Sequence, residues 1–284
     1  MNILRSRWLR REMENYQGLL NGCAPGTHEN IVRTILDTVP HRSGVLDLGA
    51  GSGALLARLR DAGFEDLHAA DLAAGNFGLS DIPYTQIDLN RSFASKYKRK
   101  FKVVCLSEVL EHLDSPRDVV RQARNLLEED GYLIITEPNV AFWEGRLKFL
   151  LTGELWGFGE KNYRSIRHIS PMTDVQLRLT LQEIGFHVVK SGTAGSFATP
   201  LRRMLLAPAW LPIIAVAGKT ALGECVVVVA KKAPPDDELA KPTIYDSVWT
   251  DAGKVGCSDT PDEVFGQHSI SPGLLAIGDD EVIQ

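Results

Sequence analysis

The chain has 284 residues, of which 44% are hydrophobic and 24% are charged. This is an ordinary globular composition, and it excludes a wholly disordered or fibrous protein. Residues 233–284 hold eleven acids and two bases, a net −9 within a total of −5, so residues 1–232 carry +4. That mild excess lacks the concentrated basic face of a nucleic-acid-binding protein, and we expect no nucleic-acid partner.

The cysteines and the first residues of the chain indicate a compartment. Four cysteines stand far apart, at positions 23, 105, 225 and 257, and no pair has CxxC spacing. This pattern predicts neither a zinc site nor a disulfide framework. The first residues contain no apolar stretch of signal-peptide length, so we expect a protein of the reducing cytoplasm.

The first 27 residues read as a basic helix and a loop. Residues 1–20 combine arginines with Ile3, Leu4, Trp8 and Leu9, a pattern that predicts an amphipathic helix. A loop over 21–27 follows, and Thr27 is a suitable N-cap for a helix over 28–39.

Strands and helices then alternate along the chain. Apolar runs predict seven strands, over 45–48, 67–71, 84–88, 101–106, 132–136, 186–192 and 224–232. Helical patterns cover 54–63, 115–131 and 172–185, and Pro116 suits a first helical turn. This alternation predicts an α/β fold with a parallel sheet covered on both faces. From Ala233 onward the periodicity disappears, and we interpret 233–284 as an acidic flexible tail.

The segment VLDLGAGSG, residues 45–53, runs from a strand through three glycines into a helix. Glycines there permit a tight turn and let the backbone approach a ligand, and the helix N-terminus presents free N–H groups. Taken alone the loop is ambiguous. Gly49, Gly51 and Ala54 also satisfy GxGxxA, the dinucleotide fingerprint, and a plain strand-to-helix turn is a third interpretation.

Three acids at successive strand ends narrow the choice. Asp47 precedes the first glycine, where a carboxylate can reach an amine but would repel a pyrophosphate. Asp71 ends the next strand, a position from which a carboxylate accepts hydrogen bonds from ribose hydroxyls. Asp88 ends the third strand and can reach the edge of an adenine. Together they describe an adenosine that carries an amino acid and no phosphates.

With these residues in view, the chain resembles the class I S-adenosylmethionine-dependent methyltransferases. The motifs stand here as LDLGAGSG (46–53), HAADL (68–72), QIDLN (86–90) and SEVLEHL (107–113). The last of these is similar to a segment of the small-molecule branch, which includes quinone-pathway O-methyltransferases and polysaccharide or lipid tailoring enzymes. The resemblance covers residues 28–232, which we expect to be the methyltransferase domain.

The resemblance implies a fold and a cofactor. The fold is a Rossmann-like three-layer sandwich with a seven-stranded, mostly parallel sheet whose last strand is antiparallel. The cofactor is S-adenosyl-L-methionine. The residues that the resemblance assigns to its binding are Asp47, Gly49, Gly51, Gly53, Asp71, Leu72, Asp88, Leu89 and Ser107.

Two histidines are candidates for the catalytic base. His112 follows the fourth strand, where substrate and methyl group meet in the family, and an imidazole suits proton transfer near neutrality. His168 lies in a segment, 137–173, that is rich in aromatics and bases and resembles a lid over the acceptor. It could act as the base or bind an anionic acceptor together with Arg167. Both histidines also have a purely structural interpretation. We expect no metal, because no carboxylate pair with an adjacent Asn stands at metal spacing.

The sequence thus predicts a methyltransferase that acts on a small molecule, at a hydroxyl of a sugar, a lipid-linked glycan or a quinone-like ring. The alternatives are a catalytically inactive, cofactor-binding scaffold and an NAD-dependent oxidoreductase. Residues 204–217 are uncharged and apolar but too short to span a bilayer. Because Pro208 and Pro212 should break a helix, we expect either a buried connection or a peripheral membrane contact with Trp210 at headgroup level. The sequence does not indicate the oligomeric state.

Overall fold

The computed structural model describes residues 11–40 and 42–234. Its nine strands are β1 (Asn15–Tyr16), β2 (Leu19–Leu20), β3 (Ser43–Leu48), β4 (Glu65–Asp71), β5 (Tyr84–Gln86), β6 (Phe101–Ser107), β7 (Leu127–Pro138), β8 (Phe186–Ala194) and β9 (Cys225–Lys232). The α-helices are α1 (Thr27–Thr38), α2 (Ala54–Asp61), α3 (Pro116–Leu126), α4 (Trp143–Thr152), α5 (Glu160–Ile166), α6 (Asp174–Ile184), α7 (Pro200–Leu205) and α8 (Ala207–Ala217). Short 3-10 turns include η4 (Leu110–His112) and η5 (Lys219–Ala221).

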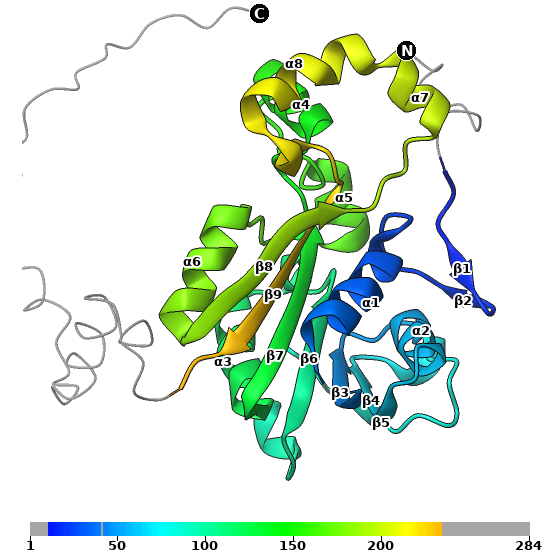
Figure 1. Ribbon diagram of the computed structural model, residues 1–284, viewed down its shortest axis with the longest axis vertical. Coiled ribbons are helices and arrows are strands. Elements are labelled where there is room, and N and C mark those ends of the chain that lie inside the picture. The colour runs from blue at the N-terminus through cyan, green and yellow to red at the C-terminus, as the bar shows by residue number, and fades with distance from the viewer. Residues whose placement is uncertain (1–10, 41, 235–284) are drawn as a thin grey trace, which may run out of the picture. The chain divides into compact units, whose positions relative to one another are not determined.

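Seven of the strands form one sheet in the order β5-β4-β3-β6-β7-β9-β8 (Figure 1). The pairs among β3, β4, β5, β6 and β7 are parallel, whereas β9 runs antiparallel to both β7 and β8. The predicted seven-stranded, mostly parallel sheet with an antiparallel last strand is therefore confirmed. The run of valines in β9 is buried because that strand is inserted between two others, with helices on the faces of the sheet.

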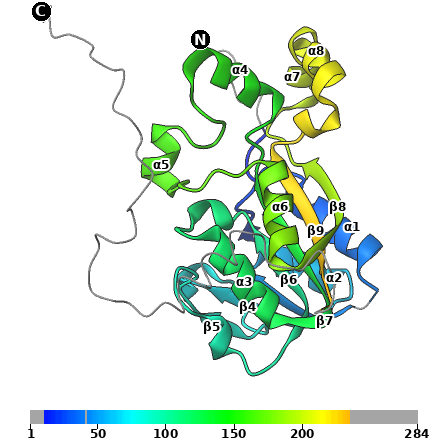
Figure 2. The same cartoon turned by 90° about the vertical axis from the view of Figure 1, so that its left-hand side faces the viewer.

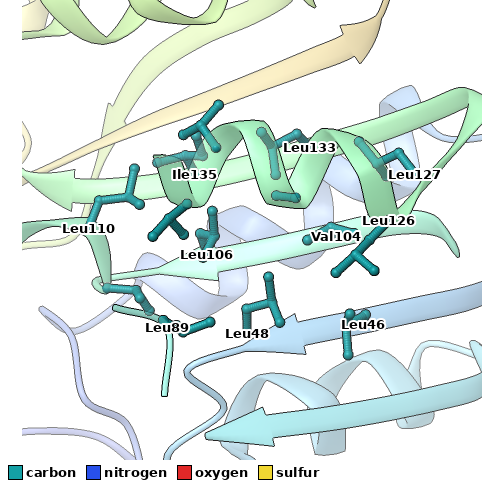
Figure 3. Close-up of a cluster of buried hydrophobic side chains, with 14 of the residues drawn as sticks. Leu46, Leu48, Leu89, Val104, Leu106, Leu110, Leu126, Leu127, Leu133 and Ile135 are labelled. Carbon is teal, nitrogen blue, oxygen red and sulfur yellow. The ribbon is translucent and has the colours of Figure 1, made fainter. Parts of the chain in front are cut away.

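Helices cover both faces of this sheet and make three layers. Alternate residues of one strand point to opposite faces, so Val45 packs toward α1 and α2 while Leu46 and Leu48 pack toward α3 and α6. Figure 3 shows the cluster on the α3 and α6 side, which includes Leu126 of α3, Val104 of β6 and Leu133 of β7. The Rossmann-like sandwich that the resemblance implied is confirmed.

The helix predicted over residues 1–20 is wrong where the structure describes it. Residues 15–20 form the β1–β2 hairpin, and Gln17 and Gly18 at its turn both have positive φ, +53° and +85°. Such a turn matches the twist of a two-stranded hairpin. The buried Leu19 packs in the core on the α2 side, and Leu20 O accepts a hydrogen bond from Ser52 Oγ, so tertiary contacts outweigh the helical pattern. Residues 1–10 lie outside the described part of the chain.

Two further boundaries differ from the sequence prediction, and one predicted segment lies almost wholly outside the described residues. Gly26, and not Thr27, is the N-cap of α1, and Thr27 is its first helical residue. Helix α3 ends at Leu126, because residues 127–131, which the helical pattern had included, already belong to β7. The flexible tail predicted over 233–284 lies outside the described residues from position 235 onward.

Residues 204–217 do not form a buried connection. Helix α8 is continuous with Pro208 in its first turn, where no N–H donor is needed, and with Pro212 in its interior. No residue of α7 or α8 is buried. Helices α4, α7 and α8 gather beyond one end of the sheet (Figures 1 and 2). No helix in the described ranges has the length and apolar content needed to cross a membrane.

Candidate active site

The glycine loop joins β3 to α2, and its three predicted glycines all have positive φ. A Cβ on Gly49 would meet Val109 Cγ2 at 2.4 Å, so packing opposes any side chain there. A Cβ on Gly53 would meet Leu79 Cδ1 at 2.9 Å and would have to displace that side chain, and the φ of +88° also favours glycine. A Cβ on Gly51 would have no protein atom within 4 Å. Gly51 therefore lines open space, as expected where a ligand approaches the backbone.

Asp71 stands opposite this loop, at the end of β4. Its Oδ2 accepts a hydrogen bond of 2.7 Å from the Gly51 N–H, and its Oδ1 accepts one of 2.6 Å from the Leu72 N–H. The Leu72 side chain is exposed. The carboxylate thus joins the ends of two neighbouring strands, and it lies at the edge where ligands bind in open α/β sheets.

Asp47 is buried beneath the loop. Its Oδ1 has no hydrogen-bond partner among the described residues. Burial, and then the charge of Asp71, raise the pKa of Asp47 to about 7. A buried, unpartnered carboxyl oxygen is costly, and an amine or a water supplied from outside would relieve that cost. The two carboxyls fit an adenosine that carries an ammonium group. Asp47 has an unpartnered oxygen for the cation, and Asp71 lies at the end of the next strand, where a ribose would bind.

The remaining predicted cofactor residues follow β5 and end β6. Asp88 is half-buried, and its Oδ1 accepts a hydrogen bond from the Asn90 N–H at 2.9 Å. The Leu89 side chain packs in the core (Figure 3), so only its backbone groups are available to a ligand. Ser107 Oγ lies 3.1 Å from Thr136 Oγ1 on β7.

A cluster of three glutamates follows at the ends of β6 and β7. Buried oxygens of Glu108, Glu111 and Glu137 have no hydrogen-bond partner among the described residues. Burial first, and then Glu108 as a neighbouring charge, raise the pKa of Glu137 to about 8 and the pKa of Glu111 well above its usual range. Burial likewise raises the pKa of Glu108. Burial and mutual repulsion therefore favour the protonated forms of these carboxyls, and a cation placed among them would favour the ionised forms.

Glu108 also adopts a strained backbone, with a φ of +55°. Its N–H donates to Thr136 O at 3.0 Å, which fixes the turn between β6 and η4. Strained residues of this kind concentrate at functional sites. Sequence analysis did not single out Glu137. The signal that could have found it is a carboxyl at the end of the strand next to SEVLEHL.

The two histidines predicted as bases lie together, although 56 positions separate them in the sequence. Their ring centroids are 4.7 Å apart in an edge-to-face arrangement. His112 Nδ1 lies 2.7 Å from Ile166 O, and His168 Nδ1 lies 2.9 Å from Gly157 O. Because a carbonyl can only accept, both Nδ1 atoms carry protons, which leaves Nε2 of each ring for other partners. His112 Nε2 lies 3.9 Å from Glu111 Oε1.

The surroundings of the two rings differ. The His112 side chain is 36% exposed. Burial, and then the neighbouring His112, lower the pKa of His168 to about 4, so that ring is neutral at physiological pH. Phe158 packs on His168 with a centroid distance of 5.3 Å. The backbone N–H groups of Ile169 and Ser170 donate to Glu111 O at 2.8 and 3.1 Å, which joins the segment around His168 to η4.

Glu111, His112 and His168 also form a set that could hold a metal ion. One ligand atom from each lies within 4.8 Å of the others. Imidazole nitrogens with a carboxylate are ligands that zinc and other divalent transition metals accept. The expectation of no metal was based on the absence of a local sequence motif. These three residues come together only in the folded chain, so no local motif could indicate them.

The comparisons with known proteins agree with this geometry. A family model described as a methyltransferase domain matches residues 25–191, more than half of the chain. The chain belongs to this methyltransferase family. S-adenosylmethionine is the methyl donor of this methyltransferase, and the NAD-dependent alternative is set aside.

Relatives of this methyltransferase include two enzymes named ubiquinone biosynthesis O-methyltransferase. The one from Yersinia enterocolitica is 32% identical over 119 residues, which cover 37% of this chain and 48% of the relative. The one from Escherichia coli is 33% identical over 104 residues, 34% of this chain and 42% of the relative. The chain thus matches about half the length of these curated relatives or less. A methyltransferase from Archaeoglobus fulgidus of known structure shares the fold, with a TM-score of 0.50, 18% identity, and coverage of 73% of this chain and 95% of that one.

Proposed function

We propose that this methyltransferase transfers the methyl group of S-adenosylmethionine to a hydroxyl oxygen of a small molecule. The observation that carries the proposal is the histidine pair, in which the two rings lie edge to face and each Nδ1 is held by a backbone carbonyl. Bound S-adenosylmethionine supplies a methyl group already activated by a positive sulfur. The protein's own task is to align the hydroxyl, exclude water and accept a proton.

The residues that hold the donor in this proposal lie along the glycine loop and the neighbouring strand ends. Asp47 takes the ammonium group, and Gly51 lets the backbone approach. Asp71 binds the ribose beside Leu72, and Asp88 with the Leu89 backbone meets the adenine. Gly49 and Gly53 shape the loop, and Ser107 lies at the edge between donor and acceptor. The open space at Gly51 and the unpartnered Asp47 Oδ1 support these assignments.

The two histidines take different roles in the proposal. His168 has a pKa of about 4 and is therefore a weak proton acceptor, so we assign it a positioning hydrogen bond to the acceptor hydroxyl. His112 is the more exposed ring, and we assign it the general base. The neighbouring carboxyls of Glu108, Glu111 and Glu137 accept hydrogen bonds from hydroxyl groups of the acceptor molecule.

Alanine substitutions test the assignment. Removing the base should reduce turnover to S-adenosylhomocysteine by roughly a hundredfold or more, the usual scale of general-base catalysis. His112→Ala should show this loss with unchanged S-adenosylmethionine affinity by calorimetry, whereas His187→Ala on β8 serves as the matched control. Turnover of His112→Ala equal to the control would remove His112 from the mechanism.

A chelator separates this direct proton transfer from action by a bound cation at Glu111, His112 and His168. The proposal expects turnover to survive EDTA. Turnover that EDTA abolishes and a divalent cation restores would reassign the two histidines from bases to ligands. Wild-type protein that binds S-adenosylmethionine but forms no S-adenosylhomocysteine with any acceptor mixture would favour the inactive scaffold.

The acceptor class in the proposal is a sugar, a lipid-linked glycan or a quinone-like ring. Two observations support a ring or sugar hydroxyl: the named O-methyltransferase relatives, and the aromatic contact of Phe158 on the His168 ring. Residues 137–173, which contain α4 and α5, serve as a lid in this proposal.

We also propose a peripheral contact of the α4–α8 end with an anionic membrane surface. Val216 at the end of α8 is 92% exposed, and Leu150 and Leu151 of α4 are 78% and 80% exposed. Large apolar side chains exposed together commonly mark an interaction surface. Trp210, which the sequence placed at headgroup level, packs instead against Phe142 and Trp143, and its indole N–H donates to Arg203 O at 2.8 Å. In the proposal, the membrane contact is therefore made by Leu150, Leu151 and Val216, and not by Trp210.

Sedimentation with phosphatidylglycerol vesicles tests this contact. Leu150→Glu combined with Val216→Glu should leave the protein in the supernatant, while wild type and the control Val175→Glu on α6, where Val175 is also exposed, should sediment. If wild-type protein stays in the supernatant at low salt, the membrane contact is wrong and the acceptor reaches the site from solution.

A further inference from the structure

A cavity of about 600 Å³ lies apart from the residues assigned to donor and base. It is lined by residues of α7 and α8, the N-terminal turn of α4, and the loops that follow β8 and precede β9, and it opens to solvent. Figures 1 and 2 show these elements gathered beyond the end of the sheet. The volume falls within the range of about 300–1,000 Å³ that small-molecule sites occupy.

The lining of this cavity is cationic. Arg11, Arg202, Arg203 and Lys219 contribute to it, and none of the described lining residues is acidic. Two of the cations are paired with carboxylates that do not line the cavity: Arg11 with Glu14 at 3.1 Å, and Arg202 with Glu144 at 2.7 Å.

Arg203 and Lys219 make no ion pair with any carboxylate in the described ranges. Within the described part of the chain, these two exposed side chains, which come from two different elements, therefore carry positive charges without a carboxylate partner. The Nε atom of Arg202 is also buried without a hydrogen-bond acceptor among the described residues. An anion inside the cavity would satisfy these groups.

The rest of the wall is largely apolar and aromatic. Phe142 and Trp143 pack edge to face with ring centroids 5.7 Å apart. Leu206 and Trp210 face the same space, and the Trp210 indole N–H is already satisfied by Arg203 O. The aromatic surface thus has no unmet hydrogen-bond donor from Trp210, and it suits a hydrocarbon chain or a ring.

We propose that this cavity binds one anionic amphiphile, a molecule with an apolar chain or ring that ends in a phosphate or a carboxylate. Arg203 and Lys219 bind the anionic group, and Phe142, Trp143 and Trp210 contact the apolar part. A free anion lacks the apolar contacts and a neutral alcohol lacks the charge, so either half of the ligand alone binds weakly. No residue assigned to donor binding or proton transfer lines this site, and Phe142 and Trp143 are the two lining residues that belong to the lid segment 137–173.

Calorimetry on the full chain with decyl phosphate below its micellar concentration tests the proposal. We expect one site per chain, with inorganic phosphate and decanol each binding at least tenfold more weakly. Arg203→Ala combined with Lys219→Ala should weaken decyl phosphate binding by at least tenfold, because charge-assisted hydrogen bonds are lost. The matched control removes two exposed cations from α5, Lys161→Ala with Arg164→Ala, and should bind like wild type.

A competition experiment identifies the source of the ligand. Decyl phosphate that displaces the wild-type protein from phosphatidylglycerol vesicles assigns the cavity to a membrane phospholipid, and decyl phosphate that binds without displacing it assigns the cavity to a free amphiphile. Equal binding by the Arg203/Lys219 and Lys161/Arg164 double variants would overturn the proposal. So would equal binding of decyl phosphate and decanol. Unchanged S-adenosylmethionine affinity reports that each variant is folded, and Lys219→Ala alone provides a milder second variant.

Discussion

Gly49 and Gly51 share a left-handed backbone but are required for different reasons. Substitution of each by alanine, which adds one methyl group, distinguishes the two reasons. Gly49→Ala places a Cβ against Val109 and should lower the melting temperature by several degrees. Gly51→Ala places its Cβ in open space, so it should cost the fold only the backbone strain of about 1–2 kcal/mol. It should nevertheless weaken S-adenosylmethionine binding by tenfold or more. Thermal melts and calorimetry on both variants check the contrast, and the account is wrong if Gly51→Ala binds the donor like wild type.

Asp71 provides a second residue-scale prediction. Its carboxylate holds the Gly51 and Leu72 N–H groups, so Asp71→Ala removes a donor contact and loosens the loop that frames it. Hydrogen bonds to a charged group contribute about 1.5–3 kcal/mol, so S-adenosylmethionine affinity should fall roughly tenfold to a hundredfold. Asp81→Ala, which removes an exposed carboxylate paired with Arg60, is the matched control. Calorimetry that finds equal affinities for the two variants would refute the role of Asp71.

What the sequence reveals at this scale depends on how local the signal is. The positions of Asp47, Asp71 and the glycines were predictable because each lies at the end of an apolar strand or in the loop directly after it, and the chain direction fixes which edge of the sheet they reach. The pairing of His112 with His168 was not, because it depends on how residues 157–170 fold back over η4. Glu137 was missed for a related reason: its burial comes from β9 pairing beside it.

At the scale of elements, the carboxyls at the ends of β3, β6 and β7 couple stability to pH. The folded-state pKa of Asp47 is about 7 and that of Glu137 about 8, both raised chiefly by burial, whereas carboxyls of an unfolded chain titrate near pH 4. Between the unfolded pKa near 4 and these folded pKa values, the folded state therefore binds more protons than the unfolded state. Its stability falls as pH rises across that window, and the fall ends above about pH 8. His28 and His168, with pKa values of about 4, act in the opposite sense but only below about pH 6.5.

The ligand-free protein should accordingly melt several degrees lower at pH 8.5 than at pH 6.5. Glu137→Gln removes one of the titrating groups and should flatten this dependence, whereas Glu65→Gln at the exposed start of β4 should leave it unchanged. Differential scanning calorimetry across the range provides the measurement. A melting temperature that stays constant or rises over this interval would show that these carboxyls are ionised in the folded protein.

Strands were the easiest elements to predict, and segments outside the sheet were the hardest. The apolar runs of β3, β6 and β9 are long and buried on both faces, so composition alone marks them. The β1–β2 hairpin and α8 contradict the local pattern. In the first case the packing of Leu19 decides, and in the second a proline inside a helix is tolerated at a surface where few packing contacts oppose it.

At the scale of the whole molecule, the proposed function places the donor at the ends of β3 and β4 and the base after β6. The α4, α7 and α8 helices add a cationic and apolar region beyond the ends of β7, β8 and β9. The central claim is that the site at the ends of β3, β4 and β6 performs O-methylation with His112 as its base.

The most direct test is incubation of the purified protein with methyl-deuterated S-adenosylmethionine and a fractionated small-molecule extract, followed by mass spectrometry. The account predicts S-adenosylhomocysteine together with a product whose label sits on oxygen, both formed by wild type and by His187→Ala and both reduced roughly a hundredfold or more with His112→Ala. Label found on nitrogen or carbon, or equal product from the His112→Ala variant, would contradict it.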